Sequence, residues 1–226
     1  MNAGRTARER ARAELTEEIK TAARQQLASV GAEALSLRAI SRELGMVSSA
    51  LYRYFASRDE LLTALIIDAY DALGEAAEAA AGGDDLVEEW VAIYAAVRGW
   101  ARAHPHEYAL IYGSPVPGYT APVTTVPPAS RVGLLLIGIV RDAHHEGVLA
   151  DAPELPDDLT AEAGRMAADL APDLPPATVV ALIAAWAELF GLVGFELFGQ
   201  FNRVVEDRRP FFRHGAIRIA HAVGLR

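Results

Sequence analysis

The sequence predicts an all-α protein. Alanine and leucine are abundant, β-branched residues seldom alternate with polar ones, and the apolar positions of successive segments follow helical spacing. The chain has 226 residues, 52% of them hydrophobic, so it can bury one large core or two modest ones. We expect a three-helix unit at the N-terminal end, followed by a larger helical domain.

Charge is divided unevenly along the chain. The net charge is −9, but residues 1–62 hold ten Lys or Arg against eight Asp or Glu, whereas residues 63–226 hold eleven against twenty-two. Because salt screens charges beyond roughly 8 Å, a small basic face can attract phosphate on an acidic protein. The asymmetry predicts two domains with different partners, at 1–62 and 63–226.

The first residues are basic and lack apolar periodicity. Residues 1–11 carry Arg5, Arg8 and Arg10, and we expect an arm without regular structure. This arm is either a solvated tail or a basic segment that contacts phosphates or the minor groove of DNA. Residues 12–30 have an apolar face and predict the first helix.

The stretch from Ser36 to Arg58 is the most informative. Apolar residues at i, i+3 and i+7 predict a short helix over 37–44, with Ser36 as its N-cap. Gly45 supplies the backbone freedom for a sharp turn, and a second short helix is expected at about 48–55. Two short helices joined in this way form a helix-turn-helix, whose second helix can enter the major groove of DNA.

The polar residues of the second helix have separable roles. Ser48 and Ser49 stand at its N-terminal end, where side chains of a major-groove helix meet base edges. Tyr52 and Tyr54 can donate hydrogen bonds to phosphates, and Arg53 can reach a phosphate or a guanine edge. The alternative for both tyrosines is packing within the small domain.

Val47 stands where this helix needs a cap. Valine cannot accept a hydrogen bond from a backbone amide, and losing such a cap typically costs roughly 0.5–2 kcal/mol. Either Ser48 takes over the cap and is partly withdrawn from base reading, or the helix starts less firmly and becomes ordered on DNA.

These residues resemble a known family. Gly45, the run LYRYF at 51–55, and Ser57-Arg58 followed by DELL are similar to the DNA-binding signature of the tetracycline-repressor (TetR) family of bacterial regulators. The match runs over about 15–65. The resemblance implies that Arg38 contacts a base or a phosphate and that Arg58 is directed at phosphate.

The rest of the chain resembles the WHG-type group of the same family, through RGWARAHPHEYALIYGSPVPGY and AAWAELFGLVGFELFG. The resemblance implies a homodimer that binds a double-stranded DNA operator of palindromic sequence. It also implies a repressor that a small-molecule effector, bound within 63–226, releases from DNA. A regulator without effector control, which simply holds DNA or a protein partner, is the alternative.

A long helix is expected to connect the two domains, at about 59–81, with Asp59 and Glu60 at its positive end. A loop rich in proline, glycine and threonine is expected at 113–127. The further helices are expected at about 84–103, 105–113, 128–146, 159–170, 175–201 and 207–223.

Five aromatic residues lie shortly before that loop. Tyrosine and tryptophan offer apolar area together with a polar atom, as small-molecule pockets require. Aromatic residues at helical spacing also form ordinary cores. The pocket candidates are Trp90, Tyr94, Trp100, Tyr108 and Tyr112.

The segment 175–201 is apolar almost all round. A helix without a polar face has to be covered on every side, either by a partner subunit or as the central helix of a monomer. Together with 207–223 we assign it to a dimer interface. The interface candidates are Val179, Ile183, Trp186, Phe190, Val193 and Leu197.

Little in the sequence supports an enzyme, a cofactor site or a metal site. The chain has no cysteine, and it lacks GxSxG, GxGxxG, HExxH and the Walker loop, so we expect neither an enzyme nor a cofactor. His144 and His145, near His104 and His106, suggest a metal site. Neighbouring helical residues diverge by about 100°, however, so we expect no bound metal.

The chain is expected to be soluble and cytoplasmic, with no membrane partner. Residues 1–12 lack the apolar segment of a secretory signal. The longest strongly apolar run, 132–140, is shorter than the roughly 20 residues that cross a bilayer.

Overall fold

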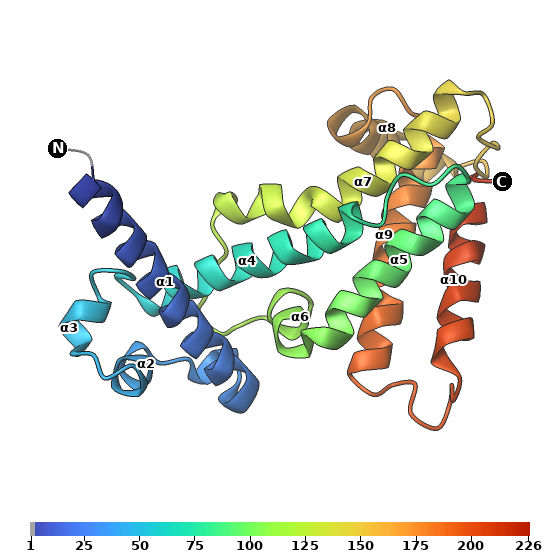
Figure 1. Ribbon diagram of the computed structural model, residues 1–226. Helices are drawn as coiled ribbons and strands as arrows, with labels where there is room; N and C mark the ends of the chain where they lie inside the picture. The colour runs from blue at the N-terminus through green and yellow to red at the C-terminus, as the bar shows by residue number, and fades with distance from the viewer. Residues whose placement is uncertain (1–2) are drawn as a thin grey trace. The chain divides into compact units, whose positions relative to one another are not determined.

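The computed structural model describes residues 3–226, with side chains from Thr6 onward, and every regular element in this range is helical. The all-α prediction is therefore confirmed (Figure 1). The α-helices are α1 (Ala3–Val30), α2 (Leu37–Glu43), α3 (Ser48–Leu51), α4 (Arg58–Glu78), α5 (Leu86–Ala103), α6 (Pro105–Tyr112), α7 (Val126–His145), α8 (Asp157–Leu170), α9 (Pro176–Leu197) and α10 (Arg208–Ala222).

Helix α1 begins much earlier than predicted. It already includes Ala3–Ala11, so the expectation of an arm without regular structure is wrong for these residues. Alanine, arginine and glutamate favour helix, and no proline interrupts them, so a helix anchored on the core extends outward without an apolar face. Arg8 and Arg10 are exposed on this extension, and the side chain of Arg5 lies outside the described residues.

The chain forms two compact units. The first contains the chain up to Tyr70 together with His104–Val126, and the second contains Asp71–Ala103 and Pro127–Arg226. Helix α4 contributes residues to both. The functional division at 62 and 63, into a DNA-binding domain and an effector domain, stays a prediction.

Helices α1 to α4 share the core of the first unit. Ile19 of α1, Ile40 of α2, Leu51 of α3 and Leu61 of α4 are fully buried against one another in a single apolar cluster. Burying a side chain of this size contributes about 1.5–3 kcal/mol. The positions are those that the helical periodicity selects, which is why such short helices as α2 and α3 are stable here.

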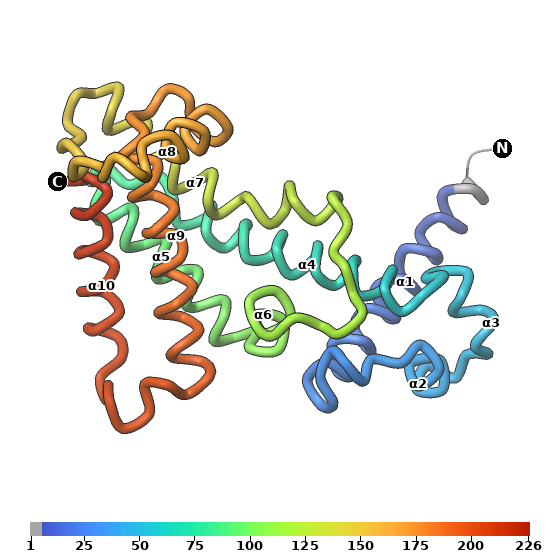
Figure 2. Tube along the Cα trace, turned by 180° about the vertical axis from the view of Figure 1, so that it is seen from behind, coloured from blue at the N-terminus to red at the C-terminus, as the bar shows by residue number. Residues whose placement is uncertain are grey.

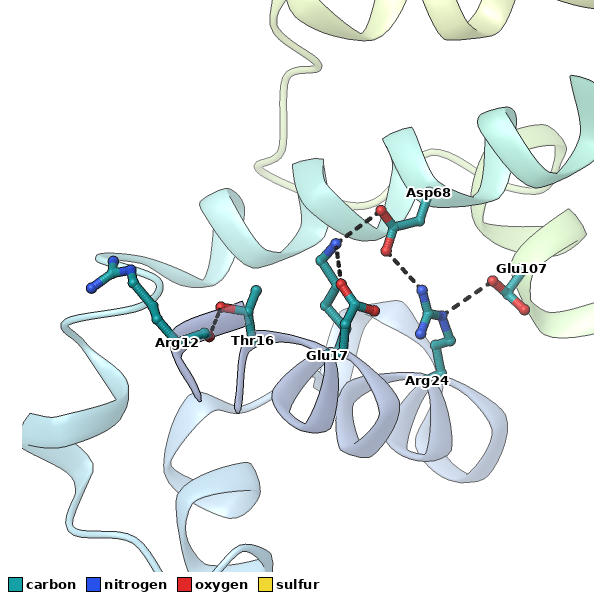
Figure 3. Close-up of polar contacts among 7 residues, drawn as sticks. Arg12, Thr16, Glu17, Arg24, Asp68 and Glu107 are labelled. Carbon is teal, nitrogen blue, oxygen red and sulfur yellow. Dashed lines mark hydrogen bonds and ion pairs between the residues drawn. The ribbon is translucent and has the colours of Figure 1, made fainter. Parts of the chain in front are cut away.

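Asp68 of α4 is the centre of an ion-pair network. Its carboxylate accepts hydrogen bonds from Lys20 at 3.0 Å and from Arg24 at 2.7 Å, both on α1. Arg24 lies between Asp68 and Glu107 of α6, whose carboxylate is 3.4 Å away (Figure 3). Burial acts to lower the pKa of Lys20, but hydrogen bonds to Asp68 and Glu17 leave it raised. The network fixes α1, α4 and α6 together within the first unit.

The segment after α6 packs on the same core. Val116 and Tyr119 lie against the apolar cluster, and the hydroxyl groups of Tyr119 and Thr63 are 2.8 Å apart. The predicted loop at 113–127 is therefore an ordered part of the first unit, with a single 3₁₀ turn at Val123–Thr125.

In the second unit, α9 runs beside α10 and α5 packs against both (Figures 1 and 2). Trp90 and Tyr94 of α5 stack with ring centroids 5.2 Å apart. The Tyr94 hydroxyl donates a hydrogen bond to the Ala185 carbonyl oxygen of α9 at 2.9 Å. Burial raises the pKa of Tyr94 far above its ordinary value, so this hydroxyl stays neutral.

Arg131 of α7 holds the C-terminal part of α4. Its guanidinium reaches the carboxylates of Asp71 at 2.9 Å and Glu78 at 2.7 Å. The Arg131 side chain passes over Gly74 of α4. A Cβ atom at position 74 would lie 2.6 Å from the Nε atom of Arg131, so this placement of the arginine requires a glycine. The hydrogen bonds from Arg131 hold the pKa of Glu78 below its ordinary value.

Two helical segments are both long and strongly apolar. Val123–His145 has a mean hydropathy of 1.6 and Pro176–Leu197 one of 2.0, and each is long enough to cross a bilayer. The expectation based on 132–140 missed this length. Core helices of soluble proteins meet the same two criteria, so length and composition alone do not assign these helices to a membrane.

Candidate nucleic-acid interface

The first half of the helix-turn-helix is built as the sequence predicts. The Ser36 side chain accepts a hydrogen bond from the Ala39 amide at 3.4 Å, as an N-cap does. Helix α2 ends at Glu43, and Gly45 follows with a φ of +65°, in the left-handed region that glycine adopts most easily. This turn directs the chain into α3.

Helix α3 is shorter than predicted. It covers Ser48–Leu51, and Tyr52 to Phe55 follow as a tight turn rather than as a second helical turn. In this turn the amides of Arg53 and Tyr54 donate to the carbonyls of Ala50 and Leu51. Because bonds of the i to i+3 type wind the backbone more tightly than an α-helix, Tyr52 and Arg53 project from a turn.

Ser48 does not take over the cap at Val47, and the other alternative, a helix that becomes ordered on DNA, stays a prediction. Val47 is the N-cap residue and offers no side-chain hydrogen bond. The Ser48 hydroxyl instead lies 3.1 Å from the Ser41 hydroxyl of α2, which in turn donates to the Arg38 carbonyl oxygen. Ser48 therefore joins the two helices, whereas its neighbour Ser49 is exposed.

Three of the basic or phenolic residues predicted to contact DNA have exposed side chains. Arg38 lies in the first turn of α2, and Tyr52 and Arg53 lie directly after α3. Tyr52 keeps 44% of its surface accessible although it is large and aromatic. Exposed guanidinium and phenol groups are able to donate hydrogen bonds to DNA phosphates, and guanidinium groups also to guanine edges.

Tyr54 and Arg58 make contacts inside the first unit. Tyr54 packs partly against the apolar cluster, and the guanidinium of Arg12 lies 5.0 Å from its ring centroid. Arg58, at the start of α4, donates hydrogen bonds to the carbonyl oxygens of Ala32 at 2.8 Å and Glu33 at 3.2 Å. The role of Arg12 could not be predicted from the sequence, because its partners Arg53 and Tyr54 are distant in the chain.

The five aromatic pocket candidates fall into different units. Trp90, Tyr94 and Trp100 are buried in the second unit, and Tyr108 and Tyr112 belong to the first. Burial raises the pKa of Tyr108 and of Tyr112 well above the ordinary range. Trp90 and Tyr94 are core residues, so they offer no accessible surface to a ligand in this conformation.

An apolar cavity of about 340 Å³ lies elsewhere in the second unit. Its walls come mainly from α7 and α9, and Leu134, Ile137, Leu182 and Trp186 are among its lining residues. Cavities of roughly 300–1,000 Å³ with apolar walls are typical of small-molecule sites. The sequence did not single it out, because its walls come from segments about 50 residues apart in the chain.

The predicted interface residues of α9 do not share one surface. Val179, Phe190 and Val193 are buried within the chain, so they have almost no surface left for a partner. Ile183 and Leu197 are half-buried, and only Trp186 is exposed. The exposed aromatic residues nearby are Phe195 and Phe198 of the α9 end and Phe211 of α10.

The histidines considered as metal ligands belong to no metal-binding group among the described residues. The rings of His144 and His145 are 6.2 Å apart, and His145 lies 3.7 Å from the Asp173 carboxylate. Among residues 3–226 no group of three or more His, Asp or Glu is arranged to hold a metal ion.

Two family models match the chain. Residues 19–65 match the bacterial regulatory proteins of the tetR family, and residues 90–218 match the tetracyclin repressor-like C-terminal domain. The first match contains the whole α2–α3 segment, and the second covers more than half of the chain.

Individual proteins agree with these matches. HTH-type transcriptional regulator Rv1816 of Mycobacterium tuberculosis is 40% identical over 202 residues, covering 85% of this chain and 84% of the relative. The crystal structure of regulatory protein SCO4313 is 34% identical with a TM-score of 0.76, covering 94% of this chain and 98% of its own. A protein from Rhodococcus sp. RHA1 shares the fold, with a TM-score of 0.68 at 21% identity over 92% of this chain and 93% of its own.

Proposed function

The chain belongs to the TetR family of bacterial transcriptional regulators, and from this premise we propose how it holds DNA and what controls it. It is a DNA-binding regulator of transcription, and its family consists of regulators rather than enzymes. We propose a cytoplasmic homodimeric repressor without a cofactor, which a small-molecule effector releases from a palindromic operator.

The exposed side chains on one side of the helix-turn-helix support the DNA contacts. The buried sides of α2 and α3 anchor them in the core, which leaves Arg38, Ser49, Tyr52 and Arg53 accessible. In our proposal Ser49 and Arg53 reach base edges, whereas Arg38 and Tyr52 hold phosphates. A dimer would place two such segments roughly 34–36 Å apart, in successive major grooves.

Ser48, Tyr54 and Arg58 have supporting roles in this proposal. Their side chains are engaged with Ser41, with Arg12 and with the carbonyls of the Ala32–Ala34 turn, respectively. They therefore position the DNA-contacting residues and are less available to touch DNA themselves.

Exposed aromatic side chains suggest where two chains meet. Phe195 and Phe211 each contact Phe201 edge to face, with ring centroids 5.6 and 5.4 Å apart, and Phe195 is 52% exposed. Apolar patches of this kind mark association surfaces in soluble proteins. We propose that the α9–α10 face carrying them forms the homodimer interface.

Sedimentation tests the dimer separately from DNA binding. At micromolar concentration the wild-type chain should sediment as a dimer, and Phe195→Glu should sediment as a monomer. Val148→Glu introduces the same charge at an equally exposed valine after α7 and should remain dimeric. A wild-type monomer would overturn the dimer and, with it, the spacing of the two DNA contacts.

For the effector we propose the apolar cavity of the second unit. It is accessible and almost free of polar groups, so it suits an uncharged apolar molecule. A ligand can lower operator affinity only by its differential binding to two conformations. Helix α4, which enters both units, is the element that such a ligand would have to move.

Selection of bound fragments from the source genome tests the function. The wild-type chain should enrich fragments that share a palindrome, and genes beside them would indicate the effector. Compounds chosen in this way should weaken binding to the enriched fragment. A regulator without effector control would keep its affinity with every compound, and failure to enrich any fragment would contradict sequence-specific binding.

A further inference from the structure

A basic cleft lies in the second unit, where α9 ends and α10 begins. Its volume is about 730 Å³, and seven of its ten lining residues are charged. Two of the seven are glutamates, Glu196 and Glu206. The other five are arginines, namely Arg98 and Arg102 of α5, Arg203 of the connecting loop, and Arg208 and Arg209 of α10.

The cleft is positively charged, whereas the second unit as a whole is acidic. The second unit contains eleven arginines and twenty acidic residues, yet five of the arginines and only two of the acids line the cleft. Like charges brought together repel one another and destabilise the fold unless an opposite charge offsets them. The two glutamates offset two arginines, so three positive charges remain.

The inner end of the cleft is rigid. Glu196 is buried, with 7% of its side chain exposed, and it pairs with Arg98 through two hydrogen bonds of 2.6 and 2.7 Å. Arg102 is 3.6 Å from the same carboxylate, while 59% of its side chain remains exposed. Glu196 therefore fixes the position of Arg98 and leaves most donors of Arg102 accessible from the cleft.

The outer end carries arginines where helix stability alone favours acids. The N-terminal end of a helix has a partial positive charge, which Asp or Glu stabilises and Arg destabilises. Helix α10 starts with Arg208 and Arg209 and has no acid in its first turn, and the side chain of its N-cap, Asp207, accepts no hydrogen bond from the helix amides. These amides and guanidinium groups together favour an anion.

Two of the arginines have neither an ion pair nor a side-chain hydrogen bond among the described residues. Arg208 is held by the Asn202 side chain at 2.6 Å, but Arg203 and Arg209 make no ion pair within residues 3–226. Arg203 also has a φ of +62°, a conformation that costs free energy for a residue with a Cβ atom. The loop thus keeps an unpaired guanidinium beside the cleft at the expense of stability.

We propose that this cleft binds a small molecule that carries at least two negative charges on phosphate groups. Arginine forks and helix amides match phosphate oxygens in geometry, and the volume lies in the range of small-molecule sites. The cleft differs from the apolar cavity in every lining residue. The proposal concerns binding alone and holds whether or not the ligand changes operator affinity.

Calorimetric titration of the full chain with inorganic pyrophosphate, at constant ionic strength, tests the proposal. One molecule should bind per chain, and Arg203→Gln/Arg209→Gln should weaken binding at least about tenfold, because two charged donors are lost. Arg141→Gln/Arg165→Gln removes the same charge from α7 and α8, outside the cleft, and should keep the affinity.

Other results would overturn the assignment. Absence of pyrophosphate binding to the wild-type chain would do so, as would equal losses in the two double variants, which would indicate a general charge effect. Binding of citrate as tightly as pyrophosphate would contradict the choice of phosphate. Reduced DNA affinity of Arg203→Gln/Arg209→Gln without any pyrophosphate binding would assign the cleft to DNA. Replacing Arg209 removes a positive charge from the positive end of α10. The melting temperature of Arg203→Gln/Arg209→Gln should therefore not fall below that of the wild-type chain.

Discussion

The guanidinium of Arg12 donates a hydrogen bond to the carbonyl oxygen of Arg53 at 3.1 Å and lies 5.0 Å from the centroid of the Tyr54 ring. Arg53 belongs to the turn that follows α3. Because α3 is only one turn long, the carbonyl groups of this turn find no hydrogen-bond donor within the helix. Helix α1 thus supplies the missing donor. The backbone of the turn that carries Tyr52 and Arg53 is held by a residue 41 positions earlier in the chain than Arg53.

Arg12→Ala should weaken DNA binding by loosening this turn. A hydrogen bond and a cation–π contact at an exposed position together contribute roughly 1–2 kcal/mol, so we expect a loss of about 5- to 30-fold. The salt dependence of the affinity should stay the same. Titrations of labelled operator at several salt concentrations, with Arg165→Ala on α8 as the control, measure both. A smaller salt slope would instead assign Arg12 to a phosphate.

Val47→Thr should stabilise α3. Threonine can accept the amide hydrogen bond that valine cannot, and such a cap contributes about 0.5–2 kcal/mol. Urea unfolding measures the gain. Val204→Thr makes the same change at an exposed valine that is not an N-cap, and it should leave the free energy of unfolding unchanged. Equal effects of the two variants would show that hydroxyl substitution at the surface matters and that the cap does not.

Asp68→Asn should destabilise the first unit. The change removes the charge that offsets both Lys20 and Arg24, and charge-assisted hydrogen bonds contribute about 1.5–3 kcal/mol each at full strength. Since Asp68 is one-quarter exposed, we expect a loss of about 2 kcal/mol in chemical unfolding. The isosteric change Glu162→Gln, at a solvent-exposed pair on α8, should leave the free energy of unfolding almost unchanged.

Arg131→Gln should make stability less dependent on pH. The hydrogen bonds from Arg131 lower the pKa of Glu78 in the folded chain. The Glu78–Arg131 pair therefore stabilises the fold above pH 4.5, the ordinary pKa of a glutamate. This stabilisation is lost as the pH falls through the lower pKa of the folded chain. Glu78 is nearly half exposed, so the difference from wild type should be at most about 1 kcal/mol near pH 7. Thermal unfolding should show it disappearing below about pH 4. A difference that persists in acid would indicate a packing role for Arg131.

Much of the fold follows from local signals in the sequence. Ser36 and Gly45 delimit α2 because a cap and a left-handed glycine act over a few residues. The end of α3 at Leu51 could not be predicted in this way. The turn that follows it accepts a hydrogen bond from Arg12 of α1, and a contact between distant residues leaves no periodic pattern in the sequence.

The candidate sites could likewise be predicted only in part, because contacts between distant residues also decide them. Helical spacing predicted that α9 is apolar, but Val179, Phe190 and Val193 are covered by the chain's own helices. The sequence does not show which neighbour covers which side of a helix. The roles of the arginines were hidden for a similar reason, since Glu196 and Arg98 meet across 98 positions.

The affinity of Tyr52→Phe/Arg53→Ala for a selected genomic operator tests most directly whether the turn after α3 holds DNA. Two contacts to charged or base groups should be lost, so we expect binding about 100-fold weaker at roughly 0.15 M salt, with an unchanged melting temperature. Tyr52→Phe alone should weaken operator and non-operator DNA alike, as loss of a phosphate contact requires. A double variant that binds the operator as tightly as wild type would contradict the account.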